Sequence, residues 1–270
     1  MPTRYSDDSS APAATSSRRS FAGTMFAALY GELLPHEWRG PSPEQDAFSL
    51  FVQHASAMGW TSESNGLWEM NDAGWDHPRA DRAAGLVSWF QVDAASPEPA
   101  MPLPVQPFLR CATEVTARAG ALDLMTAQVL MPVGGLAPHA RPRRGGVPSM
   151  RTARWFGEAS PAARTRVHVT IDVGAGGANA VQRLGDWFLG LEQQVFHPSA
   201  EAPRPDDEWL PPPFDETFWS GPSAERIKFA GDLSEWSADA IGWLAEVLAE
   251  GVAQLGGDSP ILATTTRFPN

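Results

Sequence analysis

The chain has 270 residues, 43% of them hydrophobic, and a formal net charge of −12 at neutral pH. This length predicts one large domain or two small ones, with enough buried surface to form a core without disulfide bonds. The acidic balance argues against general binding of nucleic-acid backbones. No run approaches the roughly 20 apolar residues of a membrane-spanning helix, so no membrane association is expected.

The composition also indicates a compartment and a source. The single cysteine, Cys111, cannot form an intrachain disulfide, and residues 1–20 lack the apolar run of a secretory signal. We therefore predict a cytoplasmic protein with a disordered tail over residues 1–20. Lys228 is the only lysine among 20 basic residues. Codon bias in a GC-rich bacterial genome accounts for this; the alternative is selection for the bidentate donors of arginine where arginines cluster.

The first half of the chain contains three predicted helices and two predicted strands. Phe21 to Leu34 is predicted to be a helix that ends at Pro35, because Phe26, Leu29 and Leu33 recur at helical spacing. Ser42 is the expected N-cap of a second helix, with Gly59 at its C′ position. The remaining predicted elements are strands at 86–92 and 124–131 and a helix at 108–119, while residues 60–84 are expected to form hairpins or irregular loop.

The second half shows clearer periodicity. Residues 166–173 alternate polar and apolar side chains, which predicts a half-buried strand. Helices are predicted at 178–196 and 237–255 from their apolar stripes. A short strand at 226–231 and a final strand at 261–268 complete the predicted elements, and a Pro-rich, acidic loop is expected over 197–221.

Each half therefore carries a strand, a long helix and a strand, without a repeat at the level of residues. We predict an α+β fold of one or two ferredoxin-like sandwiches, with a mixed sheet, helices mainly on one face and an N-terminal helical segment. The expected organisation is an N-terminal half over 21–140, an Arg/Gly/Pro-rich loop or linker over 141–163 and a C-terminal half over 164–270. One continuous domain is the alternative.

Residues 141–166 reverse the charge of the chain. They contain seven arginines, opposed only by Glu158, and Trp155 lies among them. Clustered guanidinium groups are typical of surfaces that bind carboxylates or phosphates, which favours a docking loop for an acidic or anionic partner. The alternative is a solvated loop paired with acids of the chain itself. The arginines are Arg141, Arg143, Arg144, Arg151, Arg154, Arg164 and Arg166.

A glycine-rich turn follows the alternating strand. Gly174, Gly176 and Gly177 lie between Asp172 and a predicted helix, where backbone N–H groups can face an anion. The stretch resembles the first motif of Rossmann-type methyltransferases, which implies a loop that approaches S-adenosylmethionine. The resemblance covers about six residues, and Ala178 breaks the expected glycine spacing. The alternative is a connection in which glycines supply positive φ angles.

Motifs of known catalytic machinery are absent from the sequence, including the G-x-S-x-G elbow, the Walker loop, H-E-x-x-H and C-x-x-C. We therefore predict an interaction or accessory protein without enzymatic activity, cofactor or metal, which docks a protein partner through the arginine-rich loop. The alternative is an enzyme that binds a nucleotide or S-adenosylmethionine at the turn. The predicted binding residues are Arg141, Arg143, Arg144, Arg151, Arg154, Trp155, Gly174, Gly176 and Gly177.

Overall fold

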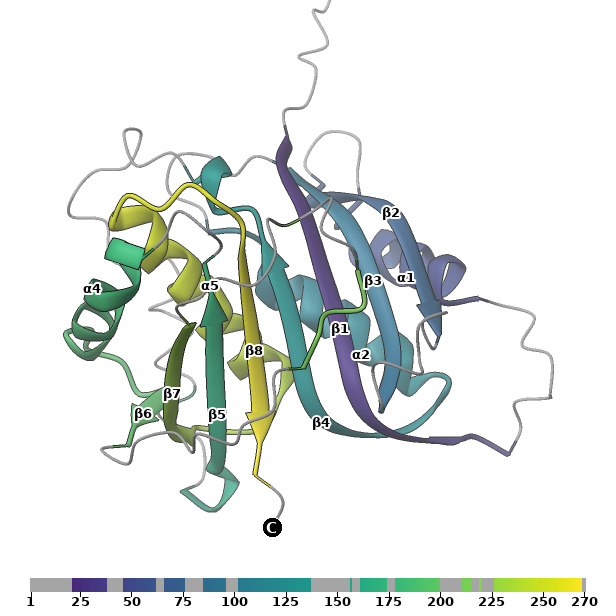
Figure 1. The fold of residues 1–270 in the computed structure, drawn as a ribbon. Coiled ribbons are helices and arrows are strands. Elements are labelled where there is room, and N and C mark those ends of the chain that lie inside the picture. The colour runs from purple at the N-terminus through teal and green to yellow at the C-terminus, as the bar shows by residue number, and fades with distance from the viewer. Residues whose placement is uncertain are drawn as a thin grey trace, which may run out of the picture.

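A computed structural model describes residues 21–37, 46–61, 66–75, 85–95, 102–136, 156, 161–173, 178–199, 210–214, 219 and 226–268. In this part of the chain, eight strands form one antiparallel sheet in the order β2-β3-β1-β4-β8-β5-β7-β6. The four α-helices of the described residues lie on one face of the sheet (Figure 1). We call the opposite side, which carries none of these four helices, the helix-free face.

The elements follow one another in the same order in both halves. The first half contains β1 (Phe21–Pro35), α1 (Ala47–Ala57), β2 (Trp68–Trp75), β3 (Leu86–Ala95), α2 (Val105–Ala117) and β4 (Gly120–Met131). The second half contains β5 (Thr165–Asp172), α4 (Ala178–Leu189), β6 (Phe196–Pro198), β7 (Arg226–Leu233), α5 (Ala238–Gln254) and β8 (Ile261–Arg267). Short 3₁₀ turns η2 (Val133–Gly135) and η3 (Pro161–Ala163) lie between the halves.

The prediction of a mixed sheet is wrong, because all strand pairs in the described residues are antiparallel. The topology explains why. In each half a helix joins two parallel strands, but another strand lies between them. For example, α2 connects β3 to β4, and β1 separates these two strands. The halves meet where β4 pairs with β8, so a single sheet runs through both.

The prediction of a helix over residues 21–34 is wrong, because Phe21–Pro35 is the long strand β1. This strand is buried on both faces: Met25 and Leu29 face the helices, while Phe26 and Tyr30 face the other way. A strand with two buried faces is continuously apolar, so its residues also satisfy helical spacing. Gly31 has a φ of +157°, and a Cβ there would lie 2.1 Å from the Asp123 carbonyl oxygen. The close pairing of β1 and β4 therefore requires glycine.

The predicted start of the second helix also differs. The N-cap of α1 is Asp46, whose Oδ1 accepts a hydrogen bond from the Ser49 N–H at 2.7 Å. This bond lowers the pKa of Asp46. Ser42, the expected cap, lies outside the described residues. Strand β2 lies within residues 60–84, which were expected to form hairpins or irregular loop. Strand β6 was not predicted, and the helix predicted over 178–196 ends earlier, at Leu189.

The main core lies between the sheet and the helices. Its largest buried side chains in the first half are aromatic: Phe51 of α1, Trp68, Phe90 and Phe108 pack with ring centroids 5.0–6.1 Å apart. In the second half, Phe188 of α4 contacts Phe196 of β6. Burial of such side chains is the dominant favourable contribution to folding.

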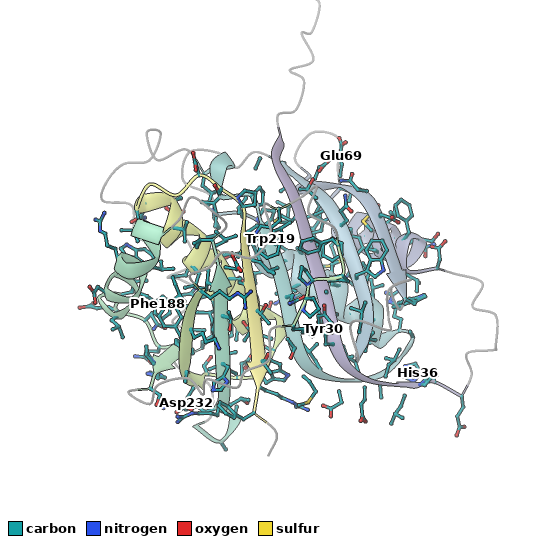
Figure 2. All side chains as sticks on the ribbon, in the orientation of Figure 1. Tyr30, His36, Glu69, Phe188, Trp219 and Asp232 are labelled. Atoms are coloured by element: carbon teal, nitrogen blue, oxygen red, sulfur yellow. The ribbon has the colours of Figure 1, made fainter. Side chains whose placement is uncertain are left out.

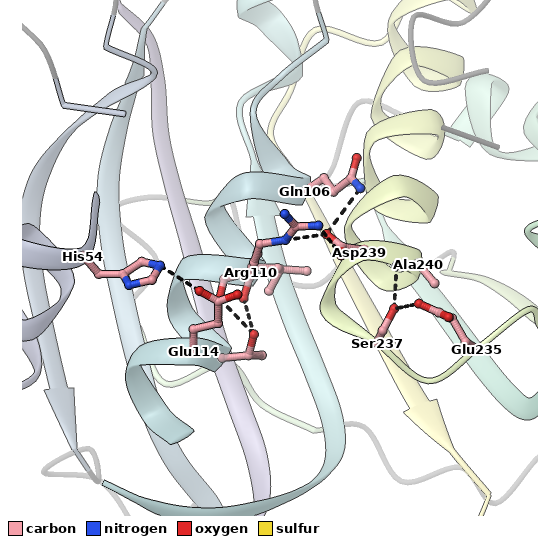
Figure 3. A network of polar contacts seen from close by, with 10 residues as sticks. His54, Gln106, Arg110, Glu114, Glu235, Ser237, Asp239 and Ala240 are labelled. Atoms are coloured by element: carbon pink, nitrogen blue, oxygen red, sulfur yellow. Dashed lines mark hydrogen bonds and ion pairs between the residues drawn. The ribbon is translucent and has the colours of Figure 1, made fainter. Parts of the chain in front are cut away.

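Helices α2 and α5 hold the halves together on the helix side (Figure 3). The guanidinium of Arg110 donates to both carboxylate oxygens of Asp239, with Nε 3.0 Å from Oδ1. The backbone N–H of Gln106, in the first turn of α2, donates to Glu246 Oε1 at 2.8 Å. Glu246 therefore satisfies an N–H that α2 itself leaves without a partner, and its charge is favourable at that helix end.

Candidate functional site

The predicted binding residues fall outside the described part of the chain. This applies to Arg141, Arg143, Arg144, Arg151, Arg154, Trp155, Gly174, Gly176 and Gly177. Of the seven arginines over residues 141–166, the structure describes Arg164, which is exposed, and Arg166, which is half-buried on β5. Arg166 lies on the helix-free face of the second half.

The elements around the glycine turn are those that the sequence predicts. Strand β5 ends at Asp172 and helix α4 begins at Ala178, so residues 174–177 connect a strand to a helix. The surrounding sheet is antiparallel, however, whereas Rossmann-type folds have a mostly parallel sheet. The turn therefore does not lie in the fold that the resemblance implies.

The helix-free face carries a band of neutral polar groups and one lysine that runs from β4 of the first half to β7 of the second half. Register pairing places Gln128, Thr264, Thr170 and Lys228 in one row across β4, β8, β5 and β7. A neighbouring row contains Thr126, Thr266 and His168. Side chains paired in this way have Cβ atoms about 5 Å apart. We call these seven residues the polar strip.

An ion pair lies at each end of the polar strip, both between β5 and β7. At one end Arg226 Nε is 3.1 Å from Asp172 Oδ2, and Asp172 is only 2% exposed. At the other end Arg166 is 3.9 Å from Asp232, and both side chains are more exposed. Within each pair the arginine and aspartate charges cancel. Among the described residues no carboxylate forms an ion pair with Lys228. The strip therefore has a charge of about +1 in a chain of net charge −12.

The corresponding face of the first half is apolar and covered. Phe26 stacks on Trp89 with ring centroids 5.6 Å apart, and Phe214 packs edge-on against Phe26 at 4.6 Å. Phe214 belongs to residues 210–214, which we call the strap. The strap crosses β1 as the short green segment in Figure 1. Tyr30 and Trp219 lie over the same region of the sheet (Figure 2).

The two halves can be compared position by position along one row of the sheet. Gln128 and Thr264 pair at its centre, where the halves meet. Two strands outward from this pair lie Trp89 in the first half and Lys228 in the second. Equivalent places in the two halves thus hold the Trp89 indole, which stacks on Phe26, and the Lys228 ammonium group, which is paired with Thr170.

The alternating polar residues of β5 are visible in the sequence, but the polar strip as a site is not. Its members come from four strands, and only pairing brings Lys228 next to Thr170, which in turn pairs with Thr264. The sequence predicted the strap residues only as part of the Pro-rich, acidic loop over 197–221. In the described residues, no group of three or more His, Cys, Asp or Glu side chains is arranged to hold a metal ion.

Cys111 lies on α2 and is fully buried. Its Sγ is 3.9 Å from the Phe51 carbonyl oxygen. Burial raises the pKa of the Cys111 thiol, and the nearby Glu114 carboxylate raises it further. Since the thiolate is the nucleophile, this environment is that of an inert core thiol.

We expect native Cys111 to resist thiol reagents. A disulfide reagent should label it with a rate limited by unfolding at pH 8, and within seconds in concentrated denaturant. The rate is measured by the absorbance of the released chromophore. Stoichiometric labelling of the native chain within minutes would contradict this burial.

Comparison with known proteins adds no family or neighbour. No protein-family model, curated protein or solved structure matches the chain. Within the described residues, no helix has the length and apolarity needed to cross a membrane. The function must therefore be argued from the site itself.

Proposed function

We propose that the chain is a non-enzymatic interaction protein that docks an acidic or anionic partner. In this proposal the contact surface consists of the polar strip together with the arginines of residues 141–154, which lie outside the described residues. The observation that supports it most directly is the contrast between Trp89 and Lys228 at equivalent places in the two halves. The face of the first half is covered by the chain's own strap, whereas Lys228 and Thr170 on the other half are only half-buried.

Charge complementarity supports an anionic partner. Lys228 lies among hydroxyl groups that can accept or donate hydrogen bonds, and the acids at the ends of the strip are already paired with arginines. Arg166, the last of the seven arginines, lies on this face of β5. In the proposal, the arginines of residues 141–154 add their positive charge to that of Lys228. An acidic ligand would be steered to this surface, while the negative remainder of the protein would repel it.

We also propose that each half has a ferredoxin-like fold. Both halves follow the element order β-α-β-β-α-β and have equivalent strand orders in the sheet. This fold hosts many functions and does not by itself argue for one. The expected setting is the cytoplasm of a bacterium, and the expected partner is a protein.

Binding of fluorescein-labelled oligoglutamate to the full chain tests this function. We expect anisotropy to report binding at 20 mM salt that weakens at 150 mM. Lys228→Glu should weaken binding about tenfold, because it replaces an attraction with a repulsion at the strip. Arg143→Glu combined with Arg144→Glu should weaken it at least as much.

The matched control is Arg183→Glu, which makes the same charge change at an exposed position of α4. It should alter binding less than twofold. Equal losses in Lys228→Glu and Arg183→Glu would contradict a specific surface, as would no binding by the unaltered chain. A rise in melting temperature with S-adenosylmethionine or a nucleotide would instead favour the alternative function at the glycine turn.

A further inference from the structure

The strap and the sheet beneath it form a complementary pair. The strap reads Leu210-Pro211-Pro212-Pro213-Phe214. Proline fixes φ near −65° and disfavours helical conformation in the residue before it, so three consecutive prolines hold this segment extended. Such a segment has no backbone N–H at the prolines and offers carbonyl oxygens as its main polar groups.

The sheet supplies donors for those carbonyls. Gln128 Nε2 donates to the Leu210 carbonyl oxygen at 2.7 Å, and it also lies 3.3 Å from Thr264 Oγ1. The Tyr30 hydroxyl donates to Gln128 Oε1 at 2.8 Å, which fixes the orientation of the amide. The same hydroxyl lies 3.5 Å from the Pro211 carbonyl oxygen, a weaker contact because the hydroxyl has a single hydrogen.

A cluster of aromatic rings contacts the end of the strap. Phe214 packs against Phe26, which stacks on Trp89, and the ring of Trp219 lies 6.4 Å from that of Phe214. Gly74 permits this arrangement, because a Cβ there would lie 2.6 Å from Trp89 Nε1. The floor is completed by Ala28, Leu130 and Leu262, all at most 2% exposed.

We propose that this face of the first half is a recognition site for proline-rich peptides with an aromatic residue after the prolines. Aromatic rings that pack on an extended apolar segment, together with donors aimed at its carbonyls, are the features by which proteins recognise polyproline. The strap occupies the site in cis, and a proline-rich segment of a partner protein is its occupant in trans. The proposal does not rest on the charge of Lys228, although Gln128 belongs both to this site and to the edge of the polar strip.

The cis strap sets the affinity for an outside peptide. A tethered segment competes at an effective concentration in the millimolar range, so the unaltered chain should bind a free peptide only weakly. Loosening the strap without changing the sheet should expose the site. Substitutions at Pro211, Pro212 and Phe214 make such a change, because these residues belong to the strap and not to the sheet.

The experiment uses a fluorescein-labelled peptide that copies residues 207–216 and measures anisotropy with the full chain. The strap variant Pro211→Ser, Pro212→Ser and Phe214→Ser should bind at least tenfold more tightly than the unaltered chain. Adding Gln128→Leu to the strap variant should weaken binding about tenfold, because the Leu210 carbonyl loses its donor. A peptide with serine at the three prolines should bind at least tenfold more weakly.

Far-UV circular dichroism and thermal melting establish that each variant is folded, and Phe214→Ala alone replaces the triple variant if that one is not. A folded strap variant that does not bind the peptide would overturn the proposal. Binding that Gln128→Leu leaves unchanged would do the same, because the peptide would then lie elsewhere. A stable dimer of the unaltered chain that exchanges straps would assign the site to a second copy and overturn the partner peptide.

Discussion

Replacing Gly242 with alanine is expected to lower the free energy of unfolding by about 2 kcal/mol. Gly242 lies on α5, where a Cβ would be 2.6 Å from the Cα and 3.1 Å from the backbone nitrogen of Gln106 on α2. Backbone atoms at a helix contact cannot rotate aside as a side chain can. The two helices must separate, and the hydrogen bond from the Gln106 N–H to Glu246 weakens with them. Urea denaturation monitored by circular dichroism measures the change.

Gly185→Ala is the matched control. Gly185 lies within α4, and the nearest atom to an added Cβ is Phe229 Cε1 at 3.9 Å, an ordinary contact. Since alanine is favoured over glycine within helices, this variant should be more stable by up to about 1 kcal/mol. The same chemical change is thus expected to have opposite signs in two helices. If Gly242→Ala were also stabilising, α2 and α5 would not be in the close contact described above.

Replacing Arg226 with methionine is expected to lower the free energy of unfolding by about 3 kcal/mol. The variant removes the cation 3.1 Å from Asp172, whose side chain is 2% exposed. A buried carboxylate that loses its cation keeps the desolvation cost without the compensating attraction. Combining Arg226→Met with Asp172→Asn should recover part of the loss, because the buried charge is then removed as well. Urea denaturation of the single and double variants measures this coupling.

The other ion pair between the same strands provides the comparison. Arg166 and Asp232 are 3.9 Å apart, with side chains 37% and 43% exposed, so water screens their attraction. Arg166→Met should therefore lower the free energy of unfolding by less than about 1 kcal/mol. Equal losses in Arg226→Met and Arg166→Met would contradict the role of burial at Asp172.

The extent to which the sequence predicted the fold depends on how each segment is buried. Strand β5 was predicted because Val167, Val169 and Ile171 face the core while their neighbours face the other way. Helix α5 was predicted from the apolar stripe of residues 237–255, and in the structure Ser237 is its N-cap, whose Oγ accepts a hydrogen bond from the Ala240 N–H at 3.1 Å. Strand β1 was mistaken for a helix because residues on both of its faces are buried, which removes the alternation that marks a strand.

The candidate sites were harder to predict, because they are made by pairing between distant residues. Lys228 and Gln128 are 100 positions apart in the chain but share one row of the sheet. The strap is recognisable as a proline-rich segment, yet nothing in its sequence indicates that Tyr30 and Gln128 lie beneath it. Local patterns report periodicity and capping, whereas strand order is set by contacts that are remote in sequence.

The sequence by itself determined the α+β class, most of the helices, the alternating strand β5 and the acidic balance of the chain. Each of these follows from local periodicity, capping or composition. Only the tertiary structure decided that the sheet is antiparallel, that β1 is a strand and that the halves share the β4–β8 pair. It also decided which half of the helix-free face lies under the strap and which presents Lys228. These features depend on burial and pairing across the whole chain, which no local window of sequence contains.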